Sequence, residues 1–314
     1  MVTKEIFTSN LPVGEKLSIK RTRFESTQKD DTSEKKRLSI VSGIHGDELE
    51  GQLVIYLLAD WLNKNQEKIR GVVDIYPAIN SLGVDTITRG FPLYDVDLNR
   101  TFPGSADDFL PGQVVYALAQ DVKGSHIAID IHSSNIFLRE IPQIRINKES
   151  SKDTLPLAKE LNCDFIWIHD AVTVLEATFS HTLNSMGTKT LVVEMGVGMR
   201  LTKEYGNQLL IGILNLMKKE GIIECEEEFS VRTPFSSEIG DVFYLNAPKS
   251  GLFVPALDHC AIIKMGNKIG DIVDPLTGSI KATLIAPNDG ILFTLREYPV
   301  VYEGSLIARI FGEK

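Results

Sequence analysis

Residues 37–63 read RLSIVSGIHGDELEGQLVIYLLADWLN. The first part, 37–44, is a short apolar run that leads into Gly and His, as a buried strand does at its end. The part from 47 to 63 has helical periodicity, because acidic residues open its first turn and its apolar residues fall near one face: Leu49, Leu53, Tyr56, Leu57 and Leu62. The segment therefore predicts a strand that leads directly into a helix.

The same alternation continues along the chain. We expect further strands at 71–77, 126–132, 140–146, 164–168 and 188–194, and helices at 111–122, 154–162, 176–186 and 203–220. Residues 78–110 form a long loop rich in Gly, Pro, Asp and Asn. Strands that alternate with helices predict an α/β fold, with an open sheet covered by helices on both faces.

Helical periodicity ends after an acidic connector, GIIECEEEF, that begins at residue 221. Beyond it, short β-rich runs are separated by turn signals: APKSG, MGNKIG, DPLTG, APNDG and YEG. We therefore expect two domains, a catalytic α/β domain over 1–225 and a C-terminal all-β domain over 226–314.

The composition is that of a globular protein, with 43% hydrophobic residues and a net charge of −9. An acidic surface repels nucleic acid and anionic membranes, so we expect neither as a partner. The N-terminus lacks the apolar core of a signal peptide, and no stretch approaches the roughly 18 apolar residues that span a bilayer. Three scattered cysteines, which we expect to be reduced and buried, indicate a cytoplasmic protein: Cys163, Cys225 and Cys260.

The sharpest local feature is GIHGDE, at the predicted strand exit. His45 and Glu48 are three residues apart, so their side chains can converge on one point, and imidazole with carboxylate suits zinc. Alone, the pair is more typical of a capping Glu beside a surface His. A second strand, SHIAIDIHSS over 125–134, delivers His132 to its own carboxyl end, where ligands bind in open α/β sheets. Two His and one Glu with an open position form a catalytic zinc arrangement.

Two further segments carry candidate catalytic or substrate-binding residues. The strand TLVVEMGVG, 190–198, carries Glu194, and a carboxylate at the end of a buried strand is either paired in a salt bridge or functional; here a general base is the suggested role. The long loop carries Arg89, Asn99 and Arg100. Arginine side chains bind carboxylates and stabilise oxyanions, although a single Arg is more often a solvated surface charge.

In this order, the segments GIHGDELEG, DLNRTFPG, IDIHSS and VVEMG resemble the succinylglutamate desuccinylase/aspartoacylase family of the zinc carboxypeptidase superfamily. The resemblance covers about 40–200 and implies a carboxypeptidase-like mixed sheet. It implies one zinc ion per chain, held by His45, Glu48 and His132. It also implies Glu194 as general base and acid.

The same resemblance implies that Arg89 polarises the scissile carbonyl and that Asn99 and Arg100 bind a substrate carboxylate. Aspartoacylase itself carries an Arg shortly before its catalytic Glu, whereas SHTLNSMGTKT offers only Lys189 here. We expect Arg145, in IPQIRI, to supply an alternative cation for substrate binding.

The C-terminal segment resembles a lipoyl/biotinyl-type sandwich. Its expected hairpin tip, 274–278, lacks the lysine that such carriers modify, so we expect no lipoate or biotin. It would instead cover the cleft or form a subunit interface in a homo-oligomer.

These features predict a zinc-dependent deacylase that cleaves the amide bond of a small N-acyl amino acid or a related carboxylate-bearing substrate. A zinc carboxypeptidase acting on short peptides and a non-catalytic zinc-containing binding protein are the alternatives.

Overall fold

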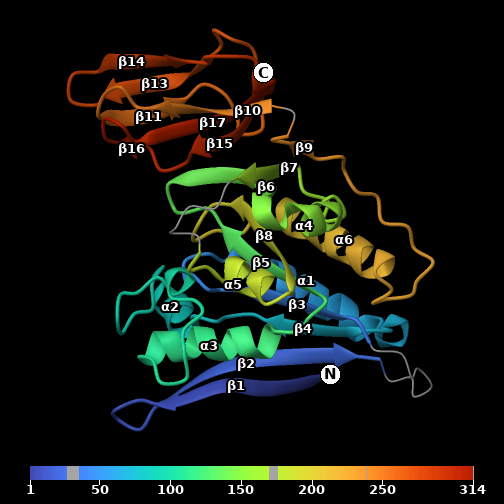
Figure 1. Cartoon of the computed structure of the whole chain (residues 1–314). Coiled ribbons are helices and arrows are strands. Elements are labelled where there is room, and N and C mark those ends of the chain that lie inside the picture. The colour runs from blue at the N-terminus through green and yellow to red at the C-terminus, as the bar shows by residue number, and fades with distance from the viewer. Residues whose placement is uncertain (27–34, 170–175, 239, 314) are drawn as a thin grey trace.

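One large mixed sheet organises the computed structural model, which describes residues 1–26, 35–169, 176–238 and 240–313. Its main path runs β1-β2-β4-β3-β5-β8-β6-β15-β17-β10. The strands before residue 200 are β1 (Val2–Asn10), β2 (Lys16–Glu25), β3 (Arg37–Ser42), β4 (Val72–Tyr76), β5 (Ile127–Ser133), β6 (Leu138–Asn147), β7 (Phe165–His169) and β8 (Lys189–Gly196). In Figure 1 the hairpin of β1 and β2 lies at one end of this sheet and the C-terminal strands lie at the other.

The centre of the sheet is parallel: β3 pairs with β4 and β5, and β5 pairs with β8. These strands are largely apolar on both faces because helices cover both, as parallel sheets require. One face packs against α1 (Glu50–Lys64) and α6 (Lys203–Lys219), and the other against α3 (Leu110–Val122) and α5 (Phe179–Ser185). The remaining helices are α2 (Ser81–Thr86), α4 (Ser151–Ala158) and short 3-10 turns at Gln66–Lys68, Leu98–Arg100 and Lys148–Ser150. The predicted α/β architecture is confirmed.

Most predicted elements are present, with their ends shifted by a few residues. The helix expected from 47 begins instead at Glu50, because residues 43–49 form a turn. The N-terminal hairpin was not predicted. The expectation of buried cysteines holds for Cys163 but is wrong for Cys225, which is partly buried, and for Cys260, which is exposed.

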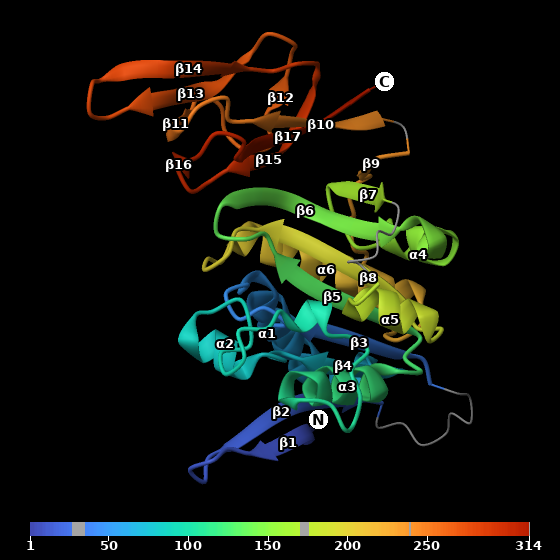
Figure 2. The ribbon, with the colours of Figure 1, turned by 60° about the vertical axis from the view of Figure 1, so that its left-hand side comes forward.

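After α6 the described residues form strands. β10 (Gly240–Asn246), β15 (Gly290–Arg296) and β17 (Leu306–Glu313) extend the large sheet through pairing of β15 with β6. The four-stranded sheet β14-β13-β11-β16 packs on them around a shared apolar cluster, as the turned view in Figure 2 shows. Its strands are β11 (Gly251–Pro255), β13 (Lys268–Asp274), β14 (Ser279–Ile285) and β16 (Val300–Val301), and β9 (Phe235–Ser236) and β12 (Ile262–Ile263) are short.

The predicted all-β C-terminal region is therefore confirmed, while the domain boundary at 225/226 stays a prediction. Among the helices of the described ranges, none has both the length and the apolar character needed to cross a bilayer.

Candidate active site

The turn between β3 and α1 carries the first two site residues. Gly43 adopts a positive φ of 65°, and a side chain on Gly46 would collide with the backbone of Gly83, since its Cβ would lie 2.0 Å from that carbonyl carbon. These glycines allow a tight, closely packed turn. Within it, His45 and Glu48 are each only 3% exposed.

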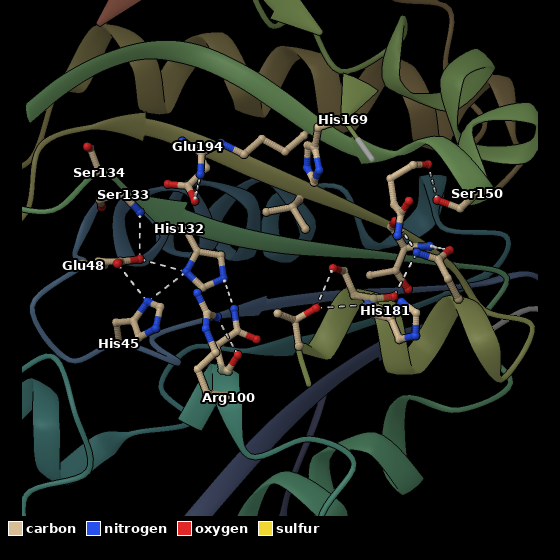
Figure 3. A pocket seen from close by; sticks show the side chains of 18 of the residues that line it. His45, Glu48, Arg100, His132, Ser133, Ser134, Ser150, His169, His181 and Glu194 are labelled. Atoms are coloured by element: carbon tan, nitrogen blue, oxygen red, sulfur yellow. Dashed lines mark hydrogen bonds and ion pairs between the residues drawn. The ribbon is translucent and has the colours of Figure 1, made fainter. Parts of the chain in front are cut away.

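The third residue, His132, lies near the carboxyl end of β5, next to β3. Parallel neighbours end at the same edge of a sheet, so His132 reaches the turn after β3. One Glu48 oxygen lies 2.8 Å from Nδ1 of His45, and the other lies 2.8 Å from Nδ1 of His132. Figure 3 shows the three side chains pointing toward one another. The structure thus brings together all three predicted metal ligands.

This group fits a divalent metal ion. Zinc with tetrahedral ligands at about 2.0–2.1 Å sets two ligand nitrogens about 3.3 Å apart, and the two Nδ1 atoms of His45 and His132 are 3.2 Å apart. The ligand atoms of the three residues all lie within 4.8 Å of one another. Two imidazole nitrogens and a carboxylate facing one another are suited to binding a cation.

Two aspartates hold the outer nitrogens of these histidines. Asp97 Oδ1 lies 3.0 Å from Nε2 of His45, and Asp130 Oδ2 lies 2.9 Å from Nε2 of His132. A carboxylate at Nε2 favours the proton there and leaves the Nδ1 lone pair for a metal. Sequence reasoning missed both residues. Asp130 had a signal, because it lies two positions before His132 and so shares its face of β5.

The charges of the group stabilise an ionised Glu48. Burial alone would raise its pKa, but the charges of His45 and His132 outweigh burial and hold the pKa of Glu48 well below its usual range. Burial lowers the pKa of each histidine, whereas the carboxylates of Glu48, Asp97 and Asp130 raise it, with a net upward shift for both. In the protein without a cation, the histidines therefore favour the protonated form.

Glu194 lies directly beside this group. It is the register partner of His132 across the parallel pair β5–β8, so both side chains project from the same face. Burial raises the pKa of Glu194 to about 7, although the positive charges of Arg145 and His132 oppose that shift. Arg145 Nη1 donates to Glu194 Oε1 at 3.1 Å. A carboxyl group that titrates near neutrality can take and return a proton at physiological pH.

The other predicted residues reach the same cavity but make contacts that the sequence did not indicate. Arg89 Nη1 donates to Glu48 Oε1 at 2.6 Å, and its Nη2 lies 3.1 Å from Nε2 of His45. Asn99 Oδ1 accepts from the backbone N–H of Phe179 at 2.9 Å, which fixes its amide. Arg100 is exposed at the cavity wall and donates to the carbonyl of Asn99.

The cavity has a volume of about 840 Å³ and extends away from the three ligands along β8. Val192 and Thr190, two and four residues before Glu194, continue its lining, and His181 and Asn184 of α5 form part of a wall. Pockets of a few hundred cubic ångströms are typical of small-molecule sites.

Known proteins are similar to this chain in sequence and in fold. The family model for the succinylglutamate desuccinylase/aspartoacylase catalytic domain matches residues 34–219. N-alpha-acetyl-L-2,4-diaminobutyric acid deacetylase of Halomonas elongata is 26% identical over 239 residues, which cover 74% of this chain and 66% of that protein. The match thus spans slightly less than two thirds of the relative.

Two solved structures share the whole fold. A succinylglutamate desuccinylase/aspartoacylase from Rhodobacter sphaeroides has a TM-score of 0.80 at 22% identity and covers 99% of this chain and 95% of its own. A product-bound ectoine utilization protein from Ruegeria pomeroyi has a TM-score of 0.80 at 18% identity and covers 97% of this chain and 92% of its own. At 22% and 18% sequence identity, these similarities show that the chains share a fold.

Proposed function

Because the chain belongs to the succinylglutamate desuccinylase/aspartoacylase family, we propose that it is a zinc-dependent deacylase that hydrolyses the amide bond of a small N-acyl amino acid. The observation that carries the proposal is the position of Glu194, one strand away from a buried group of two histidines and a glutamate. A metal site beside a carboxyl group of near-neutral pKa is a combination typical of hydrolases.

His45, Glu48 and His132 would hold the zinc ion, with Asp97 and Asp130 orienting the two histidines. Zinc bound there would supply Lewis-acid chemistry, which activates water and polarises a carbonyl group. The mixed nitrogen and carboxylate donors favour zinc over magnesium or calcium, which prefer oxygen ligands.

Glu194 would accept a proton from the attacking water at a carboxylate oxygen and return it to the leaving amine. Burial supports this role because it raises the pKa of the carboxyl group toward neutrality. Arg145 limits that rise through its contact with Glu194, so the carboxylate form stays accessible.

Arg89, Asn99 and Arg100 would bind the substrate at the cavity wall. Arg89 lies against Glu48 and His45, where its guanidinium can stabilise negative charge that develops on the carbonyl oxygen. Arg100, exposed in the cavity, is suited to a substrate carboxylate. Arg145 is a weaker candidate for a substrate carboxylate, since it is already paired with Glu194 and Glu140.

Replacement of the proposed base tests this mechanism. We expect Glu194→Gln to lower kcat by about 100-fold or more, while the zinc content measured by atomic absorption stays at one ion per chain. Glu204→Gln, at an exposed position on α6, is the control and should leave kcat unchanged. Near-full activity in Glu194→Gln would show that another group moves the proton.

A substrate panel separates the proposal from its alternatives. The zinc-loaded protein should hydrolyse N-acetyl and N-succinyl amino acids and leave unblocked dipeptides intact. Preference for dipeptides would indicate a carboxypeptidase. A zinc-replete protein inert toward the whole panel would indicate a binding protein.

A further inference from the structure

Charged side chains, one of them buried and three partly buried, form a path from the C-terminal strands to Glu194. The path follows the strand register: Glu140 of β6 is opposite Thr294 of β15, and Thr294 is opposite Arg309 of β17. Side chains opposite one another in paired strands share a face of the sheet. The C-terminal strands therefore place Arg309 beside Glu140, in the wall of the same cavity.

Glu140 is the centre of this path. It is 1% exposed and accepts a hydrogen bond from Arg309 Nη1 at 2.5 Å and one from Arg145 Nη2 at 2.9 Å. The other terminal nitrogen of Arg145 donates to Glu194. Two arginines and two carboxylates thus alternate from β17 to β8, and their formal charges cancel.

The guanidinium of Arg309 is also held by aromatic rings. It lies 5.5 Å from the ring centre of Trp167 and 5.8 Å from that of Tyr244. Arg145 lies 5.7 Å from the same Trp167 ring. Stacking and a buried hydrogen bond restrict both side chains, which favours a fixed structural partner over a mobile substrate-binding group.

We propose that Arg309 and Glu140 are positioning residues that hold Arg145 against Glu194, so that the C-terminal strands help to set the geometry of the catalytic carboxylate. This inference rests on the proposed function of Glu194. Glu140 shares its carboxylate between two guanidinium groups: Arg309 contacts Oε1, and Arg145 contacts Oε2 at 2.9 Å and Oε1 at 3.2 Å. Without Arg309, the buried Glu140 keeps one cationic partner and draws Arg145 toward itself, away from Glu194.

Arg309→Met is the first test. We expect kcat to fall about 10- to 100-fold, because small misplacements of a reacting group have effects of this size, while KM changes less than about threefold. Arg296→Met is the matched control, since Arg296 of β15 also stacks on a ring, that of Phe137 at 5.0 Å, but does not contact Glu140. Its kcat should stay within about twofold of wild type. A raised KM with unchanged kcat in Arg309→Met would overturn the inference, because it would place Arg309 on the substrate.

A double variant tests whether the effect passes through Glu140. If Arg309 acts through that carboxylate, Glu140→Gln combined with Arg309→Met should have the same kcat as Glu140→Gln alone. If the reduction of kcat in the double variant equals the product of the reductions in the two single variants, the two residues act independently and the inference is overturned. If Arg309→Met does not fold, Arg309→Lys replaces it; lysine keeps the charge but loses the planar fork, and a smaller loss of kcat at unchanged KM is expected.

A crystal structure of Arg309→Met gives an outcome independent of turnover. The inference expects the contact of 3.1 Å between Arg145 and Glu194 to be lost. If that contact persists, the inference is wrong even when the deacylase proposal holds. If wild-type protein is inert toward every acyl amino acid but the contact is lost in the variant, the proposed function fails and the structural coupling stands.

Discussion

The two candidate metal-binding histidines each have a carboxylate partner on the side away from Glu48. Asp130 is 1% exposed and lies on the same strand as His132. A buried carboxylate at this position fixes the ring and increases the basicity of the opposite nitrogen. The sheet therefore orients His132, whereas His45 is oriented by Asp97 of the long loop.

Substitution of Asp130 should weaken metal binding. We expect Asp130→Asn to reduce zinc affinity about 10- to 100-fold, because a neutral amide stabilises the proton on Nε2 of His132 less than a carboxylate does. Competition with a zinc chelator of known affinity measures this change. Unchanged affinity would mean that Asp130 has no part in orienting His132.

Glu194 should make the metal-free protein less stable as the pH rises. Its pKa is raised from 4.5 to about 7 by burial. Between these values the unfolded chain ionises Glu194 and the folded chain keeps it protonated. The stability that Glu194 contributes is therefore fully present below pH 4.5 and falls as the pH approaches 7. Between pH 5 and 7.5, the free energy of unfolding of the wild type should fall by about 2 kcal/mol more than that of Glu194→Gln. Urea unfolding with a chelator present measures both values. Equal losses in both proteins would contradict the raised pKa.

Residue types and spacing were sufficient to predict His45, Glu48, His132 and Glu194 as one group, because strand ends in an open sheet converge at one edge. The contacts that these residues make with other side chains were not predictable in the same way. The pairing of Arg89 with Glu48 depends on how a long loop returns over the turn after β3. No periodic pattern encodes such a return.

At the scale of elements, Gly212 allows α6 to pack closely against the backbone of Leu161. A Cβ at this position would lie 2.0 Å from the carbonyl oxygen of Leu161. At Gly206 of the same helix, a Cβ would meet side chains rather than backbone, with Cδ2 of Leu53 nearest at 2.8 Å. A leucine tip can rotate away, whereas a backbone carbonyl cannot.

Alanine at these two positions should therefore have different effects. We expect Gly212→Ala to lower the free energy of unfolding by about 1–3 kcal/mol through overpacking. Gly206→Ala should be close to neutral, because the helix gains about 0.5–1 kcal/mol from losing a glycine. Urea unfolding followed by circular dichroism compares the two variants. A smaller loss of unfolding free energy in Gly212→Ala than in Gly206→Ala would contradict the close packing.

Long periodic elements were predictable, and their ends were less so. The acidic residues 47 and 48 are typical of a first helical turn, yet α1 starts at Glu50. The structure uses Glu48 for the site, and Asp47 accepts a backbone hydrogen bond from Met199. Tertiary contacts of Glu48 and Asp47 thus override a local capping pattern. The hairpin of β1 and β2 was missed, although it pairs with β4 through β2.

At the scale of the whole molecule, a metal ion would join the turn after β3 to the end of β5. Binding to the folded state alone stabilises that state, by about 2.7 kcal/mol when free zinc is 100 times its dissociation constant. We expect a chelator to lower Tm by several degrees and to abolish deacylase activity. Zinc should restore both, and magnesium neither, since the donor set includes two imidazoles. An unchanged Tm after verified metal removal would contradict a structural link through the ion.

The pairing of β15 with β6 has a consequence for the first part of the chain on its own. Ile141 and Phe165, from the first part of the sequence, share an apolar cluster with Phe293 and Phe311 from the last. A fragment ending near residue 225 would expose these side chains together with the unpaired edge at Leu138–Glu140, and such edges recruit other chains. The C-terminal strands thus protect the first part of the chain from self-association.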